Sequence, residues 1–356
     1  VAEMLQAPVD TPVSGKGVIP DAHPLAVGWG YGRQGTRAAE KAFKDVDLVL
    51  AVGVRYSEVS TANYAIPDID VVHVDINPEN MGKNVRTCQT LVSDSRVFLD
   101  RLLGEAGTLR RQPDPALWSK IDGLRKVDRR VARTQQITQC VDPMYFLSQL
   151  RCVLGPDELI FVDVTASTHW ASEAVEVQGV RRYFTPSDNQ SMGWAIPAAI
   201  GAQRVRPDRH VVCVTGDGCF LMSAMETSTA ARAGLPVKFF VFDDGAYHYM
   251  QMLQEPVYRR TTATEIARID YAAFAASVGL GYNQIASNDD VVPGLQRAFG
   301  LAGPVLNHVL VSYEGREIRW LNALRRKYIR DLPNRDKVRL AARIGVRTVA
   351  PKDDDD

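Results

Sequence analysis

The chain has 356 residues, of which 46% are hydrophobic and 24% are charged, a composition typical of globular domains. Its 42 basic and 42 acidic side chains cancel, so bulk charge gives no reason to expect nucleic acid or a membrane surface as a partner. No apolar run is long enough to span a bilayer, and the N-terminal residues lack a signal-peptide pattern, so we predict a cytoplasmic protein. Five scattered cysteines without a CxxC pair favour a reduced chain over a disulfide framework or a zinc site.

Short apolar runs rich in β-branched residues alternate with helical segments along the chain. We predict strands at residues 47–54, 70–76, 158–164, 210–218, 237–244 and 305–313, and helices at 37–45, 219–233 and 271–278. Continuous apolar runs are typical of parallel strands that are covered on both faces. The alternation predicts an α/β fold with two doubly wound parallel-sheet domains and a C-terminal arm.

The same pattern divides the chain into four segments. Residues 1–105 form a first domain and residues 141–313 a second. The polar stretch between them, 106–140, contains two prolines and is predicted to be a linker with a solvated helix. Residues 314–356 form a basic arm, for which a solvated helical tail and a lid over a site are both open.

The strongest chemical signal is a strand that runs into Gly216-Asp217-Gly218, followed by a helix and a second strand that ends at Asp243-Asp244. Asp217 and Asp244 lie 27 residues apart and end two strands joined by one helix, at the edge where open α/β sheets bind ligands. Two carboxylates, a loop carbonyl and two phosphate oxygens would complete the shell of Mg²⁺. The glycines and the N–H groups at the start of the helix favour a phosphate. An isolated GDG more often only caps a helix; the whole run favours a metal site.

This run resembles the signature of the thiamine-diphosphate enzymes, most closely that of the acetohydroxyacid (acetolactate) synthase and pyruvate oxidase branch, which has GDG, a spacer of this length and Asn-Asn. The resemblance implies that Asp217, Asp244 and the carbonyl of Ala246 bind Mg²⁺. This sequence departs from the family in having Asp243-Asp244 where Asn-Asn is usual. Asp244 can still bind a hard cation, but the extra negative charge should weaken cofactor binding unless the metal neutralises it. Diphosphate contacts are implied for Gly216, Asp217, Gly218 and Cys219.

Two further segments resemble the same family. Met192, in segment 189–203, matches the apolar residue that holds thiamine diphosphate in its bent V shape, although core packing is the plainer role for a lone methionine. A turn after the strand at 158–164 matches the family turn that helps to hold the diphosphate, with side chains that differ from the usual Gly-Gln-His. Its residues are Thr165, Ala166 and Ser167. Backbone N–H groups of this turn could serve instead of side chains.

Two histidines lie near these segments. His169 and His248 have a side chain that can act as acid or base near neutral pH. Lone histidines near a site are more often structural, and of the two we retain only His248 as a catalytic candidate.

The first domain resembles the central domain of acetohydroxyacid synthases at residues 14–25, 30–36, 53–56 and 74–84. The loop GYGRQG also satisfies G-x-G-x-x-G, but that motif indicates a dinucleotide fold only directly after a strand. Because His23-Pro24 precedes the loop, a simple dinucleotide-fold interpretation is not favoured. In the family this region binds FAD, although several relatives keep the domain without flavin, so FAD is open here. The implied contacts are Gly32, Arg33, Gln34, Arg55 and Asp75.

The resemblance covers residues 1 to about 330. Family members have three domains, in the order pyrimidine-binding, central and diphosphate-binding, so this chain is expected to begin inside the central domain and to lack the pyrimidine domain with its catalytic Glu. The cofactor is clamped between two subunits in the family. We therefore expect a homodimer or tetramer, with the pyrimidine-domain segment supplied by a longer native chain or by a neighbouring subunit.

Three functions follow, of which we favour the first. It is the thiamine-diphosphate- and Mg²⁺-binding portion of a decarboxylase and carboligase that acts on a 2-oxo acid such as pyruvate. The second is a non-catalytic, degenerate cofactor-binding or assembly protein, suggested by Asp243-Asp244 and by the altered turn at 165–167. The third is a flavin- or nicotinamide-dependent oxidoreductase built on the glycine-rich loop.

Overall fold

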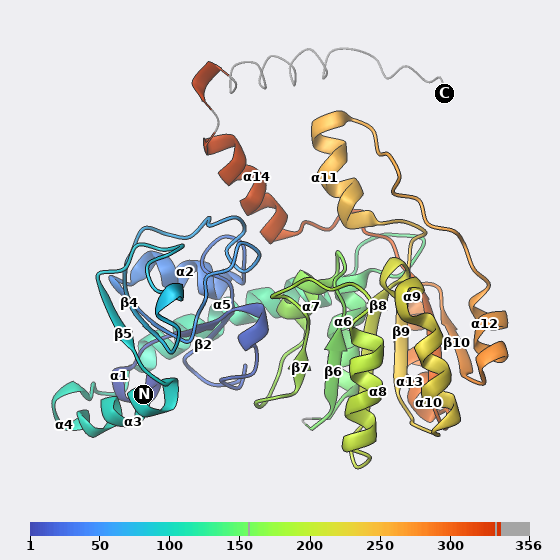
Figure 1. Ribbon diagram of the computed structural model, residues 1–356, viewed down its shortest axis with the longest axis horizontal. Coiled ribbons are helices and arrows are strands. Elements are labelled where there is room, and N and C mark those ends of the chain that lie inside the picture. Colours follow the sequence, from blue (N-terminus) through green and yellow to red (C-terminus); the bar gives the residue numbers. More distant parts are fainter. Residues whose placement is uncertain (156, 332, 336–356) are drawn as a thin grey trace.

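The computed structural model of the chain describes residues 1–335 except 156 and 332 (Figure 1). The end of the predicted C-terminal arm, from residue 336 onward, lies outside the described residues. Figure 1 shows a first domain on the left and a second domain with a large sheet on the right. Strand pairing within the sheets of both domains is parallel, so the predicted α/β class is confirmed.

The first domain is built from short strands and helices. They are α1 (Ala2–Leu5), β1 (Val9–Thr11), β2 (Ala26–Trp29), α2 (Arg37–Asp45), β3 (Leu48–Val52), β4 (Asp70–Asp75), β5 (Gln89–Val92), α3 (Ser95–Gly104) and α4 (Ala106–Leu109). The strands form two separate parallel sheets, β1-β2 and β3-β4-β5. Strands β3 and β4 and helix α2 lie where the sequence predicts them.

The segment predicted as a linker contains a 19-residue helix, α5 (Pro115–Arg133). Asp114 caps its start by accepting a backbone hydrogen bond, and Pro115 occupies the first turn, where a missing N–H leaves no bond unmade. The helix is confirmed, but it is not merely solvated, because Ile121 is buried and packs against the first domain. Its neighbours there are Leu25, Val27, Ala38 and Ala39.

The second domain contains a six-stranded parallel sheet of order β10-β11-β9-β8-β6-β7 (Figure 1). Its strands are β6 (Leu159–Val162), β7 (Tyr183–Phe184), β8 (Val211–Gly216), β9 (Lys238–Asp243), β10 (Gly281–Ile285) and β11 (Val305–Leu310). The four strands predicted in this part of the chain are all present. Strands β7 and β10 were not predicted, because one is very short and the other is half polar.

Helices cover both faces of this sheet. They are α6 (Pro143–Val153), α7 (Thr168–Ala174), α8 (Ala195–Val205), α9 (Asp217–Ser223), α10 (Thr227–Arg232), α12 (Tyr271–Val278) and α13 (Val291–Gly300). Two further helices, α11 (His248–Tyr258) and α14 (Arg319–Asp331), project beyond the sheet at the top of Figure 1. The predicted helix at 271–278 matches α12. The one predicted at 219–233 is divided into α9, a 3₁₀ turn and α10.

Successive side chains of each strand fill two different cores. In β9, Phe239 packs into the core under α8, α10 and α12, whereas Phe240 packs into the core under α6, α7 and α13. Both rings are fully buried, and burial of such a side chain stabilises the fold by about 1.5–3 kcal/mol. The carboxyl edge of the sheet is therefore held from both faces.

The described part of the C-terminal arm is packed against the two domains. Arg316 forms a buried ion pair with Asp142, the residue that caps α6. Arg319, the first residue of α14, pairs with Glu40 of the first domain at 2.7 Å. The start of the arm is therefore neither a solvated tail nor a free lid.

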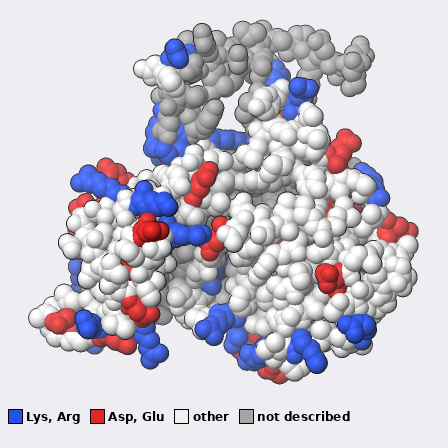
Figure 2. All heavy atoms as spheres, in the orientation of Figure 1, with Lys and Arg blue, Asp and Glu red and all other residues white. Residues whose placement is uncertain are grey.

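Acidic and basic side chains are interspersed over the described residues on the face seen in Figure 2. Within the described part of the chain, no helix is both long enough and apolar enough to cross a membrane.

Candidate functional site

The large sheet has a topological switch point between β6 and β8. From β6 the chain crosses to β7 on one side and then returns to β8 on the other side. In open α/β sheets such a reversal leaves a crevice outside the carboxyl ends of the two strands, where ligands bind. The residues that follow these strands are Asp163 and Asp217. Topology alone therefore selects the edge that carries the GDG turn.

Asp217 and the loop after β9 meet at this edge. Strands β8 and β9 are parallel neighbours with Gly216 opposite Phe242, so the residues that follow them are adjacent. Asp217 is buried, and its Oδ1 accepts the N–H of Gly218 at 2.7 Å. Its Oδ2 accepts the N–H of Gly245, in the loop after β9, at 2.8 Å. The structure thus brings the two acidic strand ends together.

Three carboxylates gather in this place. Burial, and then the charge of Asp244, raises the pKa of Asp217 above its ordinary value. Burial also acts to raise the pKa of Asp243, but the hydrogen bond and charge of His308 outweigh it, and that pKa lies below its ordinary value. Oδ2 of Asp244 lies 2.9 Å from Nδ1 of His248. A buried group of carboxylates of this kind is stabilised by a cation.

The donor set fits a hard cation of small size. Among the described residues, no three His, Cys, Asp or Glu side chains form a ready-made metal cluster. The expected set has only two carboxylates, Asp217 and Asp244, and relies on a backbone carbonyl and on phosphate oxygens for the rest, as Mg²⁺ sites commonly do. Ala246, the expected carbonyl donor, lies in the loop between β9 and α11, where it forms a bridge with Glu265.

Both glycines of the GDG turn make close contacts. A Cβ on Gly216 would lie 3.0 Å from Cγ2 of Thr165, so the turn after β6 lies directly against the GDG turn. A Cβ on Gly218 would lie 2.5 Å from Cε1 of Tyr247. The sequence did not single out Tyr247, and its ring forms a wall of the site.

The turn after β6 uses its own hydrogen bonds. The N–H of Thr165 donates to Oγ1 of Thr168 at 2.9 Å, and the N–H of Ser167 donates to Oγ1 of Thr165 at 3.0 Å. Ala166 and Ser167 are buried. We expected these N–H groups to be available to a diphosphate, but two of the three are engaged within the turn, because threonine hydroxyls lie within reach of them.

Met192 lies beside α9, at the edge of the same crevice. It is 37% exposed, which does not favour core packing as its role. The next residue, Gly193, has a φ of 78°, and a Cβ there would lie 2.9 Å from Met222 of α9. On the other side of the turn, Sγ of Cys219 donates to the carbonyl of Val164 at 2.9 Å. The 192–193 segment, α9 and the turn after β6 therefore form one continuous wall.

His248, the retained catalytic candidate, is held between two groups. Besides Asp244, its ring stacks on Tyr313 with the centroids 4.3 Å apart. Tyr313 is buried, and its hydroxyl lies 3.4 Å from Oγ of Ser167. Tyr313 is a second residue that sequence reasoning missed, because it follows β11, far along the chain from the GDG turn.

His169 is a structural residue. Its buried ring lies between Trp29 and Trp320, with centroid distances of 5.6 and 4.9 Å. Burial lowers the pKa of His169 to about 3, so the ring is neutral at pH 7 and has no acid–base role there.

Comparison with known proteins bears on this geometry. Residues 163–309 match the model of the C-terminal thiamine pyrophosphate (thiamine diphosphate) binding domain of the thiamine pyrophosphate enzymes, and residues 1–102 match the model of their central domain. The chain belongs to the thiamine pyrophosphate enzymes. The matched regions contain both the switch-point crevice and the glycine-rich loop.

Similar proteins include several acetolactate synthases. A probable acetolactate synthase large subunit of Methanocaldococcus jannaschii is 29% identical over 322 residues, which are 88% of this chain and 54% of that protein. An acetolactate synthase of Mycobacterium leprae is 30% identical over 84% of this chain and 49% of its own length. An acetolactate synthase large subunit of Corynebacterium glutamicum is 29% identical over 83% of this chain and 49% of its own length. The chain thus spans about half the length of these relatives.

In this chain the glycine-rich loop directly follows a strand. Strand β2 ends at Trp29, and helix α2 begins at Arg37. Strand β2 was not among the predicted strands, and it forms immediately after His23-Pro24 and Leu25. Tyr31 of the loop packs on Tyr56 with the centroids 5.0 Å apart, so the loop lies beside segment 53–56.

The residues implied for FAD differ in their surroundings. Gln34 is fully buried, and neither atom of its side-chain amide has a hydrogen-bond partner. Arg33 is largely exposed, whereas Arg55 is paired with Asp188 at 3.2 Å. Asp75 is buried at the end of β4 and caps the turn that follows it. Gly32 has a φ of 130°. The orphaned amide of Gln34 fits a ligand in this region, while Arg55 and Asp75 already have partners.

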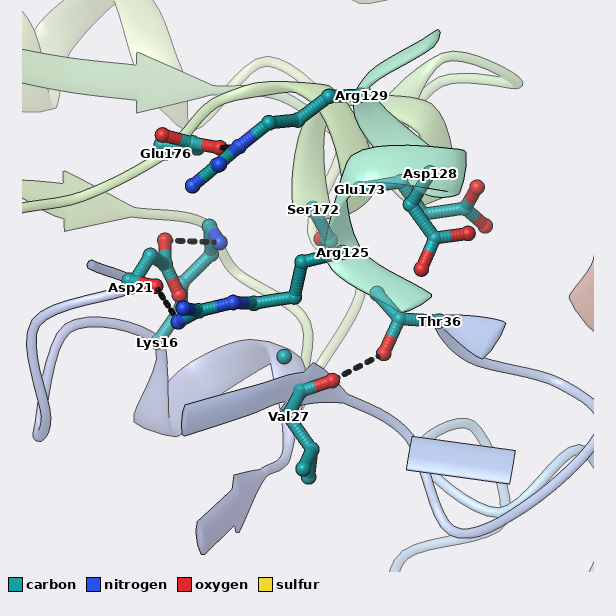
Figure 3. A pocket seen from close by; sticks show the side chains of 11 residues that line it. Lys16, Asp21, Val27, Thr36, Arg125, Asp128, Arg129, Ser172, Glu173 and Glu176 are labelled. Atoms are coloured by element: carbon teal, nitrogen blue, oxygen red, sulfur yellow. Dashed lines mark hydrogen bonds and ion pairs between the residues drawn. The ribbon is translucent and has the colours of Figure 1, made fainter. Parts of the chain in front are cut away.

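A separate polar cavity of about 40 Å³ lies where the first domain, α5 and α7 meet (Figure 3). Lys16 bonds Asp21 at 2.8 Å on one side, and Arg129 pairs with Glu176 on the other. Glu173 is half-buried, its Oε1 has no partner, and burial raises its pKa to about 8. The cavity has room for a few water molecules and is lined by none of the predicted site residues. It belongs to the junction between the domains.

Proposed function

We propose that this chain is the diphosphate- and Mg²⁺-binding portion of a 2-oxo-acid decarboxylase and carboligase of the acetolactate synthase type. The observation that carries the proposal is the buried Asp217 carboxylate at the switch point, with Asp244 beside it. Its hydrogen-bond partners are backbone N–H groups, which leave the negative charge for a cation to neutralise.

Each part of the crevice then has a role. Asp217, Asp244 and the carbonyl of Ala246 hold Mg²⁺, which in turn holds the diphosphate. Gly216 keeps the turn after β6 close, and the exposed Met192 supports the bent cofactor from the side. When bound, thiamine pyrophosphate supplies the electron sink that lets a 2-oxo acid lose CO₂. The protein supplies binding, orientation and exclusion of water.

The names of the relatives support a proposal for the substrate and the partners of this chain. Acetolactate synthases motivate a small 2-oxo acid such as pyruvate as the substrate. A homodimer or tetramer is proposed, in which a pyrimidine-binding segment of a longer chain or a neighbouring subunit closes over the crevice. His248 stays a catalytic candidate, because Asp244 binds its Nδ1 and Tyr313 stacks on its ring, and a ring oriented in this way keeps Nε2 for a proton transfer.

FAD at the glycine-rich loop is a separate proposal, supported by the position of the loop after β2 and by the unpartnered amide of Gln34. The flavin spectrum of the purified chain tests it, with Gln34→Leu as the variant expected to weaken retention. A chain that never retains flavin or nicotinamide contradicts both this proposal and an oxidoreductase role.

Two observations favour a second candidate function, a non-catalytic cofactor-binding or assembly protein. Asp243 adds a carboxylate beside the diphosphate, and the N–H groups of Thr165 and Ser167 are engaged within their own turn. A chain that binds thiamine pyrophosphate with Mg²⁺, yet releases no CO₂ from pyruvate when assembled with its full complement of domains, would favour this alternative.

The test of the main proposal is a calorimetric titration of thiamine pyrophosphate into the chain, with Mg²⁺ and with EDTA. Binding is expected only with Mg²⁺ and is expected to disappear in Asp217→Ala. Asp208→Ala, at an exposed carboxylate with ion pairs of its own, is the matched control and should bind like the wild type. Binding that is equal with EDTA, or unchanged in Asp217→Ala, would sink the proposal.

A further inference from the structure

The side chain of Asp243 is engaged at both oxygens. Its Oδ2 lies 2.7 Å from Nε2 of His308, and its Oδ1 accepts the N–H of Gly245 at 3.2 Å. Gly245 is the same residue whose N–H bonds to Asp217. With a φ of 75°, it forms the bend between Asp244 and Ala246. The single N–H of Gly245 is therefore shared between Asp217, at 2.8 Å, and Asp243, at 3.2 Å, and both carboxylates hold the bend.

His308 is itself fixed by its surroundings. It lies on β11, the neighbour of β9, in a register that places its ring beside the end of β9. Its Nδ1 lies 3.4 Å from the hydroxyl of Tyr282 on β10. Tyr271, at the start of α12, stacks on the ring with a centroid distance of 4.2 Å and an interplanar angle of 27°. A ring held by stacking and by both nitrogens presents its Nε2 to Asp243 in one orientation.

We propose that His308 is a positioning residue for the metal loop. It orients Asp243, Asp243 holds the Gly245 amide, and the bend at Gly245 sets where Asp244 and the Ala246 carbonyl lie. Asp243 is then a support of the loop and not a metal ligand, which gives the third carboxylate of the crevice a role of its own. The effect of His308 on metal binding rests on the proposed function, whereas its effect on the hydrogen bond between Gly245 and Asp243 does not.

The grip on Gly245 is tested in the chain without cofactor, by amide hydrogen exchange at Gly245. His308→Leu has a similar size but no donor, and we expect exchange to become about tenfold faster or more. His308→Gln retains an N–H donor near the position of Nε2 and should restore protection. His210→Leu, at the opposite end of the same sheet, is the control and should leave Gly245 unchanged. Unchanged exchange in His308→Leu, or no rescue by His308→Gln, overturns the inference.

The consequence for metal binding is tested by calorimetry with Mg²⁺ and thiamine pyrophosphate. We expect His308→Leu to weaken Mg²⁺-dependent cofactor affinity by about 10- to 100-fold, as removal of such supporting partners commonly does, and His308→Gln to recover most of it. In an Asp243→Ala background, His308→Leu should add little further loss, because the histidine acts through the aspartate. Additive losses, or wild-type affinity in His308→Leu, contradict the proposal.

The two tests separate the inference from the function beneath it. If the wild-type chain fails to bind cofactor while His308→Leu still accelerates exchange at Gly245, the proposed function fails and the grip on the loop stands. If the wild type binds cofactor and His308→Leu leaves exchange at Gly245 unchanged, the proposed function stands and the role of His308 fails.

Discussion

Asp217 accepts the backbone N–H of Gly245 at 2.8 Å, which ties the turn after β8 to the loop after β9. The bond joins the two segments that would hold a cation between them. It also leaves a buried carboxylate whose partners are uncharged, and burial raises its pKa. Such an arrangement favours ligand binding at the expense of the stability of the empty chain.

Asp217→Asn should therefore be about as stable as the wild type at pH 8 in the absence of ligand. The amide removes the buried charge but keeps only one of the two acceptors that bind the N–H groups of Gly218 and Gly245, so we expect the free energy of unfolding to stay within about 1 kcal/mol of the wild type. Denaturant unfolding measures it. With Mg²⁺ and thiamine pyrophosphate the wild type should be the more stable of the two, because only the wild type gains binding energy. A loss of more than about 1 kcal/mol without ligand would contradict this account.

The main features of this edge could be predicted from one sequence, because β8 and β9 are continuous apolar runs and the residues that follow them stand out. The residues that reach this edge from other strands and loops could not be predicted from the sequence. His308 lies opposite Val241 only because β11 pairs with β9 in that register, and the register is set by the folded sheet. The ring of Tyr247 lies against Gly218 because of the path of the loop, which has no sequence pattern.

The first domain illustrates another limit. Strand β2 is the four-residue run Ala26–Trp29, and with a glycine in the middle it has too little pattern to be distinguished from a loop. It was therefore not among the predicted strands, although the glycine-rich loop follows it directly. Helix α5 was predicted from its polar composition, but its apolar residues Leu117, Trp118, Ile121 and Leu124 pack against the first domain, and Ile121 is buried.

Gly218→Ala should destabilise the chain by about 1–3 kcal/mol, because its Cβ would lie 2.5 Å from the Tyr247 ring. Tyr247→Ala should be partly compensating, so that the double variant loses less than the sum of the two single losses. Gly201→Ala, in helix α8 with open space around the position, is the control and should be neutral or stabilising. Thermal and denaturant unfolding give the four values. Strict additivity would mean that the ring does not set the requirement for glycine.

Glu173 should make stability depend on pH across the neutral range. Its folded-state pKa is raised to about 8 from the ordinary 4.5, so between these values the folded chain holds a proton that the unfolded chain has released. Stability contributed by this group is present at low pH and falls as pH rises, by at most about 1.4 kcal/mol per unit, until pH passes the folded pKa.

Glu173→Gln keeps the size of the side chain but does not titrate, so the variant lacks the pH-dependent contribution of Glu173 to stability. The difference in unfolding free energy between the variant and the wild type should therefore grow in favour of the variant from about pH 5 to pH 8. Urea unfolding at intervals of one pH unit measures the difference. Parallel pH profiles for the two proteins would show that Glu173 is already ionised in the folded chain.

The stack of Trp29, His169 and Trp320 should matter for stability and not for proton transfer. Trp320→Ala removes a buried ring that joins α14 to both domains, and we expect a loss of about 3–5 kcal/mol. His169→Phe keeps an aromatic ring in the stack, and because His169 is neutral at pH 7 it should leave both stability and Mg²⁺-dependent cofactor affinity close to those of the wild type. Unfolding and calorimetry on the two variants decide the matter. Cofactor affinity that falls in His169→Phe, with stability intact, would give the histidine a role in the site that its burial argues against.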